Sequence, residues 1–215
     1  NSRFHIILGW EAKGRREGGV GFAIRSDLQR DLEQPQSINK GIMKLRIPLS
    51  CRRFVTVFSI YAPTLSDSEE NIQAFYEEPR RSILLVPLNE KLVVLGDFNV
   101  CVGRDYGAWN VLGHHRITKV NNNGLHLLKM CSELVLIVGN TFFHHKMKHK
   151  ITWIYPRSKQ CHVSTLQANY KICAVSEYCE VLIVILFTKW LGPSSSSGSA
   201  RKFVVQVYKY QRKLM

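Results

Sequence analysis

Apolar and polar positions divide the chain into short alternating segments. Strand-like apolar runs lie at residues 20–24, 42–49, 54–61, 92–95 and 134–138. The run at 54–61 is apolar on both of its alternating faces, which predicts a strand that is buried on both sides. Segments with helical spacing stand between the later strands. This alternation predicts an α/β fold in which helices cover a sheet.

Two helices are predicted between these strands. Ser66 and Glu69 have the spacing of a capping box, and apolar residues follow at helical intervals at Ile72, Phe75 and Tyr76. Pro79 is expected to kink or end this helix, because its ring excludes the backbone of a helix interior. A polar turn is predicted at residues 121–124. The second helix follows it, with its apolar face marked by Leu125, Leu128 and Cys131.

The sequence changes character after residue 162. The periodicities weaken, residues 192–199 have the Gly/Ser composition of a flexible linker, and residues 201–215 are basic and aromatic. We therefore expect a folded domain over residues 10–162 and a divergent, Ser-rich and basic tail over 163–215. The longest apolar run, residues 181–187, is far shorter than the roughly 18–20 residues of a membrane span. No membrane partner is expected.

The charge balance indicates a polyanionic partner. The 215 residues include 30 Lys and Arg against 16 Asp and Glu, a net charge of +14. A field of this sign favours DNA or another nucleic acid. The six cysteines form no Cys-x-x-Cys pair, which is typical of reduced thiols in an intracellular protein. Basic charge and a nucleic-acid partner make a nuclear location the expectation.

The segment LVVLGDFN at residues 92–99 has the clearest chemical potential. A buried strand is expected to end at Gly96 and to carry Asp97 and Asn99 at its carboxyl end, where open α/β sheets bind ligands. Residues two apart in an extended segment point the same way. A carboxylate can take a proton from water, and an amide N–H can hold a phosphate oxygen. A simple turn made by Asp and Asn remains an equal alternative on these letters alone.

Several blocks together resemble the endonuclease/exonuclease/phosphatase superfamily. They are GFAIRSDL at 21–28, LRIPL at 45–49, SIYAP at 59–63, FYE at 75–77, VLGDFNV at 94–100 and PRSK at 156–159. Within this superfamily, the blocks resemble the endonuclease domain of RTE/Bov-B-type non-LTR retrotransposons and its domesticated or retroposed relatives. The resemblance covers roughly residues 10–162. It implies an incomplete four-layer α/β sandwich whose N-terminal strands are missing.

The resemblance also implies hydrolysis of DNA phosphodiesters with Mg²⁺. Asp97 would orient and deprotonate the attacking water, Asn99 would position the scissile phosphate, and Tyr61 would contact it. Thr152 and Trp153 would lie near the site. Physically this is an in-line displacement in which the protein supplies positioning and charge stabilisation. Mere packing remains the alternative role for Tyr61.

Other parts of the family pattern are missing from this chain. The resemblance places a second catalytic Asp at Thr165, and a threonine supplies no carboxylate. The metal-binding Glu falls before the matched region, and the sequence contains no Asp-His pair for the terminal motif. No intact metal site is therefore expected, and Mg²⁺ binding is doubtful.

The sequence thus indicates a remnant of a Mg²⁺-dependent DNA endonuclease with impaired catalysis. The alternative is a non-enzymatic, basic nucleic-acid-binding protein, with phosphate contacts from Arg104, Arg157 and Lys159. Lysine and arginine contacts to phosphate give affinity without sequence choice.

Overall fold

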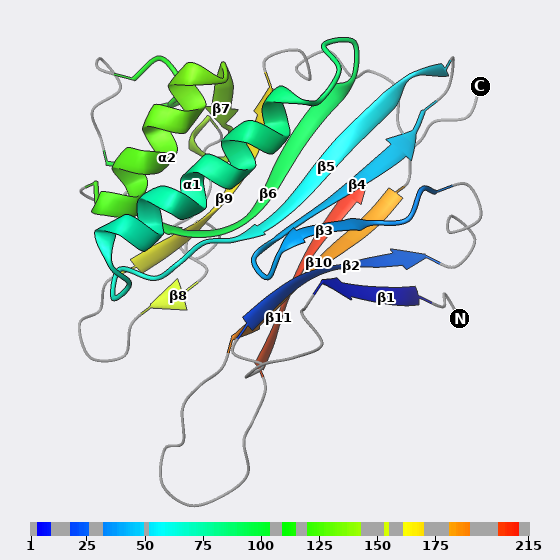
Figure 1. The fold of residues 1–215 in the computed structure, drawn as a ribbon, viewed down its shortest axis with the longest axis horizontal. Helices are drawn as coiled ribbons and strands as arrows, with labels where there is room; N and C mark the ends of the chain where they lie inside the picture. Colours follow the sequence, from blue (N-terminus) through cyan, green and yellow to red (C-terminus); the bar gives the residue numbers. More distant parts are fainter. Residues whose placement is uncertain are drawn as a thin grey trace, which may run out of the picture. The chain divides into compact units, whose positions relative to one another are not determined.

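The computed structural model describes ten segments of the chain, and the chain packs as two compact units (Figure 1). The described segments are residues 4–9, 18–25, 32–49, 52–103, 109–114, 120–142, 153–154, 161–169, 181–189 and 202–210. Unit 1 comprises Asn1–Tyr61 and Ala174–Met215, and unit 2 comprises Ala62–Cys173. The predicted boundary between residues 162 and 163 remains a prediction.

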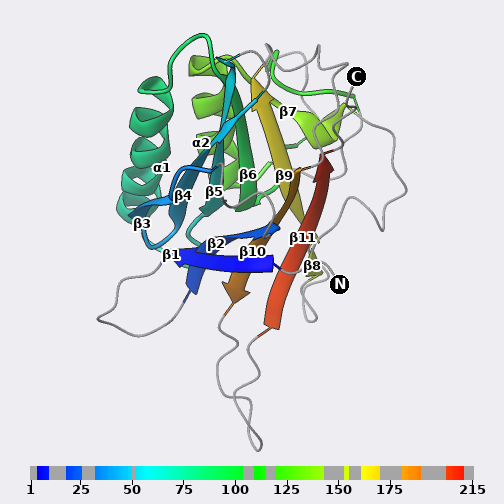
Figure 2. The same ribbon diagram turned by 90° about the vertical axis from the view of Figure 1, so that its right-hand side faces the viewer.

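Unit 1 contains two sets of antiparallel strands. The first set is ordered β1-β2-β10-β11, which Figure 2 shows side by side, with bounds β1 Phe4–Gly9, β2 Gly18–Arg25, β10 Val181–Lys189 and β11 Lys202–Tyr210. The second set is a meander of β3 (Gln36–Asn39), β4 (Ile42–Pro48) and β5 (Phe54–Tyr61). The apolar run at 181–187 therefore forms most of a strand of unit 1.

Burial in unit 1 follows the sequence pattern. All six residues between the two ends of β5 are buried, which confirms the prediction of a doubly buried strand. In β4 the apolar positions Met43, Leu45 and Ile47 are almost fully buried, while Lys44 and Arg46 between them are partly exposed. This alternation means that one face of β4 packs into the core while the other presents cationic side chains.

Unit 2 combines strands with two helices. Its strands are β6 (Lys91–Val100), β7 (Leu136–Val138), β8 (Trp153–Ile154) and β9 (Cys161–Asn169). Strand β9 pairs antiparallel with β6, β7 and β8. A short 3-10 turn at Gly139–Thr141 follows β7. Phe98, Leu127, Leu128 and Leu136 are among the fully buried side chains of this unit.

Helix α1 spans Glu69–Leu84 and differs from the sequence prediction at both ends. Its cap is Ser68, whose side chain accepts a hydrogen bond from the Asn71 N–H; the predicted cap at Ser66 is wrong. The helix also continues past Pro79 for five residues, so this proline does not end it; the alternative expectation, a kink at Pro79, remains a prediction. A missing backbone N–H removes one bond of the ladder, and the packing of the apolar helix face compensates for it.

Helix α2 spans Asn122–Glu133, and its first turn uses the residues that were predicted to form a polar turn. Asn121 is the cap: its side chain accepts a hydrogen bond from the Gly124 N–H. Leu128 and Cys131 are buried as expected, but Leu125 is 45% exposed. The buried face turns instead through Leu127 and Met130, because α2 is enclosed by β6 and β7 as well as by α1.

The two helices lie side by side and parallel (Figure 1). Near the beginnings of the helices, the Glu69 carboxylate accepts a hydrogen bond from the Asn122 side-chain amide, and its Oε1 lies 2.7 Å from His126 Nε2. Near their ends, Arg80 donates to Glu133 at 2.7 Å. Tyr76 lies between these two contacts: its ring stacks on His126, and its hydroxyl donates to the Asn123 carbonyl at 3.2 Å. Polar contacts between the two helices are therefore found near both ends and in between.

The α/β class predicted from the sequence is confirmed. The four-layer stacking implied by the resemblance remains a prediction. Neither described helix is long and apolar enough to cross a membrane.

Replacing Pro79 with alanine is expected to stabilise the protein. An interior proline is about 3 kcal/mol less favourable than alanine in a helix, whereas removing two buried methylenes costs roughly 1.6 kcal/mol. Pro79→Ala should therefore raise the free energy of urea unfolding by about 1–2 kcal/mol. The exposed Gln73→Ala in the same helix is the control and should change it by less than about 0.5 kcal/mol. A lower midpoint for Pro79→Ala would contradict this account.

Tyr76 is expected to make stability fall at high pH. Burial, with smaller contributions from Cys131 and Asp97, raises the pKa of Tyr76 far above its ordinary value. Above about pH 10 the unfolded chain releases this proton while the folded chain keeps it, so the free energy of unfolding decreases with pH. Tyr76→Phe should make that decrease shallower by up to about 1.4 kcal/mol per pH unit. Urea unfolding of both proteins between pH 6 and 11 measures this dependence. If the free energy of unfolding fell equally steeply in the native chain and in Tyr76→Phe above pH 10, the account would be refuted.

Candidate functional site

The GDFN segment lies at an irregularity of β6. Gly96 pairs with Thr165 and Val100 pairs with Val163, so the three residues 97–99 lie opposite the single residue Ser164. Extra residues in one strand form a bulge that turns side chains out of the regular ladder. The prediction that the strand ends at Gly96 is wrong, because β6 continues to Val100. The bulge, and not a strand end, presents Asp97 and Asn99.

Asp97 is partly exposed and organises the bulge through two hydrogen bonds. Its Oδ1 accepts from the Asn99 backbone N–H at 3.0 Å, and its carbonyl accepts from the Ala62 N–H at 2.9 Å. The first bond closes a local turn of the kind that aspartate makes with the backbone two residues on. The second ties the bulge to the start of unit 2. The carboxylate is thus held by one oxygen against the backbone.

Asn99 is buried and adopts a conformation that is uncommon for a residue with a side chain. It is 4% exposed and has φ +50°, in the left-handed region where asparagine is several-fold enriched. Its Nδ2 donates to the Ala62 carbonyl at 2.8 Å, and its own carbonyl accepts from Asn121 Nδ2 at 3.2 Å. The amide therefore holds the chain at residue 62, and its predicted role toward a phosphate remains a prediction.

Asn121 connects the bulge with the start of α2. Its Oδ1 accepts from the N–H groups of Gly124 and Cys101, at 2.8 and 3.0 Å. Its Nδ2 donates to Asn99, and its backbone N–H donates to the Cys101 carbonyl at 3.0 Å. A Cβ on Gly124 would lie 2.1 Å from that carbonyl, so only glycine permits this close approach.

Asn123 holds the chain at Pro63, directly after the Ala62 residue that bonds to the bulge. Its Nδ2 donates to the Pro63 carbonyl at 2.8 Å, and its carbonyl accepts from the Tyr76 hydroxyl. The side chain is fully buried, and among the described side chains its Oδ1 is one of two buried polar atoms without a hydrogen-bond partner. Unsatisfied buried acceptors are rare in folded proteins. Sequence reasoning missed both asparagines, although asparagine before an apolar helix pattern is a recognised N-cap signal.

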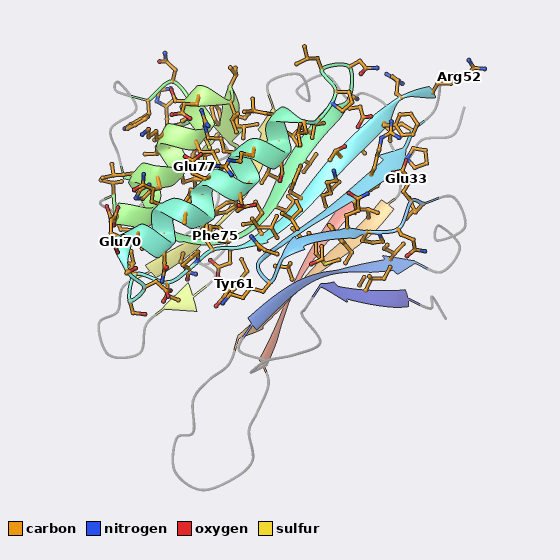
Figure 3. All side chains as sticks on the ribbon, viewed as in Figure 1. Glu33, Arg52, Tyr61, Glu70, Phe75 and Glu77 are labelled. Carbon is orange, nitrogen blue, oxygen red and sulfur yellow. The ribbon has the colours of Figure 1, made fainter. Side chains whose placement is uncertain are left out.

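The structure describes only part of the predicted site. Tyr61 is the last residue of β5, partly exposed, and its N–H donates to the Gly41 carbonyl at 2.8 Å (Figure 3). Trp153 belongs to β8, whose backbone pairs it with His162. The remaining predicted contacts lie outside the described residues: Arg104, Thr152, Arg157 and Lys159.

The donor set around the bulge does not fit Mg²⁺. This ion requires oxygen ligands in octahedral geometry, usually including one or two carboxylates besides substrate phosphates. In the described part of the chain no three His, Cys, Asp or Glu side chains gather into a metal-binding group. Asp97 already accepts a backbone N–H, and the facing position 165 carries a threonine. One partly engaged carboxylate is a poor ligand set.

Asn121 is expected to be a main stabilising residue of the site. Asn121→Ala removes an N-cap, worth about 1 kcal/mol. It also leaves the Cys101 N–H and the Asn99 carbonyl without this partner, which adds roughly 1–3 kcal/mol. The free energy of urea unfolding should fall by about 2–4 kcal/mol in total.

The adjacent Asn122→Ala is the matched control, since Asn122 is exposed and its side chain donates only to Glu69 among the described contacts. It should change the free energy of unfolding by less than about 0.5 kcal/mol. Equal effects of the two variants would contradict the role given to Asn121.

Comparison with known proteins finds distant relatives. No family model matches the chain. It is 23% identical over 218 residues to craniofacial development protein 2 of Tragulus javanicus and 24% identical over 218 residues to that of Bos taurus. The alignments cover 100% of this chain but 36% and 34% of those proteins, so the chain spans about a third of their length. From the sequence blocks we expected likeness to a domesticated or retroposed relative, craniofacial development protein 2 in our interpretation, and that likeness is confirmed. The RTE/Bov-B origin remains a prediction.

Among solved structures, the chain is similar to sphingomyelinase C from Streptomyces griseocarneus. The TM-score is 0.39 at 11% sequence identity, over 80% of this chain and 56% of that chain. A likeness at this level carries no argument about activity.

Proposed function

We propose that this chain is a DNA-binding remnant of a Mg²⁺-dependent endonuclease in which phosphodiester hydrolysis is impaired. The observation that carries the proposal is the β6 bulge and its neighbour in β9. Asp97 follows Gly96, and Gly96 lies directly opposite Thr165. The resemblance requires a second carboxylate at position 165, where this chain has a threonine, so the strand that pairs with β6 at the bulge carries the altered position.

The loss of one member of the catalytic set is enough for the impairment. Removing any member of a cooperative set lowers the rate by orders of magnitude. Here Thr165 stands where the resemblance requires a carboxylate. The remaining Asp97 and Asn99 are engaged in hydrogen bonds that stabilise the bulge. Their present contacts are those of a structural turn.

Net charge supports retention of DNA after hydrolysis is lost. A net charge of +14 attracts polyphosphate regardless of sequence. The same observation favours the second candidate, a basic nucleic-acid-binding protein without any enzymatic role. Both proposals include DNA contacts from Arg104, Arg157 and Lys159, and both fit an intracellular, nuclear location.

Two assays on the purified chain test the proposal. Retention of a fluorescein-labelled 30-base-pair duplex at 50–300 mM salt should fall steeply with salt, because each phosphate contact adds about 0.9 to the slope of log K against log salt. Nicking of supercoiled plasmid with Mg²⁺ should not exceed background for the native chain or for Asp97→Ala. Nicking by the native chain that disappears in Asp97→Ala would overturn the impairment. Absence of duplex retention at 50 mM salt would overturn DNA binding.

A further inference from the structure

Cations exceed carboxylates along the β3–β5 meander. Residues 32–49 and 52–61 of unit 1 carry five Lys and Arg against the single carboxylate Glu33. A segment of this sign attracts a polyanion. Helix α1, with four carboxylates and two arginines, has the opposite sign.

The cations of this meander include a cluster where β4 passes into β5. The Leu49 N–H donates to the Arg53 carbonyl at 2.7 Å, and Arg52 has φ +56°, an uncommon left-handed conformation for arginine. Arg52 and Arg53 are both exposed. Figure 3 shows the Arg52 side chain projecting outward just before the beginning of β5. Two guanidinium groups are thus presented at one end of the strand.

An arginine–aromatic stack borders these two residues. The Arg46 guanidinium carbon lies 3.5 Å from the centroid of the Phe54 ring, and Arg46 NH1 lies 2.8 Å from Glu33 Oε1. Figure 3 labels Glu33 beside this meander. Stacking and the ion pair hold the Arg46 fork in one orientation. We call Arg46, Arg52, Arg53 and Phe54 the basic hairpin surface.

We propose that the basic hairpin surface binds the phosphate backbone of nucleic acid. This inference rests on the proposed function for the presence of DNA binding and assigns a contact surface to it. Guanidinium groups match phosphate oxygens in pairs, and arginine beside an aromatic ring is a common element of nucleic-acid interfaces. The surface lies at the opposite end of the eight-residue β5 from Tyr61, about 23 Å away at roughly 3.3 Å per residue. It therefore contacts different phosphates from those predicted for Tyr61.

The apolar residues of the chain favour nucleic acid over an anionic membrane. Surface-bound membrane proteins insert apolar side chains besides making electrostatic contacts. Within residues 32–49 and 52–61, the stretch that carries the basic hairpin surface, no large hydrophobic residue is exposed. The described residues of the basic hairpin surface include no such anchor. Charge without an apolar anchor suits a hydrated polyphosphate better than a lipid bilayer.

Two double variants with the same loss of charge test this surface. Arg52→Ala/Arg53→Ala removes the two exposed arginines of the hairpin. Arg81→Ala/Lys129→Ala is the matched control, because it removes two exposed cations from α1 and α2. The probe is the labelled 30-base-pair duplex at 50–300 mM salt, and thermal melting by circular dichroism confirms that each variant is folded.

The hairpin variant should bind the duplex roughly 10- to 60-fold more weakly at 0.1 M salt, with a salt slope smaller by about 1.8. The control should keep the native slope. Equal losses in both variants, or no change in either, would overturn the hairpin surface while leaving DNA binding intact. Lack of binding by the native chain would instead overturn the proposed function on which it rests.

Binding to vesicles of phosphatidylserine and phosphatidylcholine tests the alternative that the surface recognises lipid headgroups. A hairpin variant that loses vesicle binding but keeps native duplex binding would show that the surface recognises lipid headgroups, and would overturn the proposal. Loss of duplex binding without any native binding to vesicles supports it.

Discussion

Unit 2 depends on the hydrogen bonds of one side chain, Asn121. Its amide caps α2, accepts from the Cys101 N–H and donates to the Asn99 carbonyl. A helix end, a strand and a left-handed residue are thereby held by three bonds from a single amide. Because Gly124 has no Cβ, the helix can approach the Cys101 carbonyl closely enough for those bonds to form. The position of the Asp97–Asn99 bulge follows from this arrangement.

Under the proposed function, the same network would let the site keep its shape after its chemistry was lost. Asp97 and Asn99 hold the Ala62 backbone and each other. These bonds stabilise the fold whether or not a phosphate is bound. Selection for stability alone would therefore preserve both residues, whereas nothing in this geometry preserves a carboxylate at Thr165. Survival of the GDFN letters is accordingly weak support for activity.

The placement of charged residues is a second constraint, independent of the bulge, on where a polyanion can bind. Helix α1 has an excess of carboxylates, and the β3–β5 meander has an excess of cations. Long-range attraction acts through the summed charge of a surface, and salt screens it within about 10 Å at 0.1 M. A polyanion approaching this chain is therefore directed by where the cations are placed. The total of +14 by itself does not contain that information.

The sequence by itself determined the α/β class, the doubly buried β5 and the helical segments, because these depend on local hydrophobic periodicity. It also singled out Asp97 and Asn99, because a buried run followed by short polar residues is a local signal. Tertiary structure alone decided that α1 continues past Pro79, that Asn121 bonds to Cys101 and Asn99, and that Thr165 faces Gly96. Each of these depends on contacts between residues distant in sequence, whose packing and hydrogen bonds outweigh local preference.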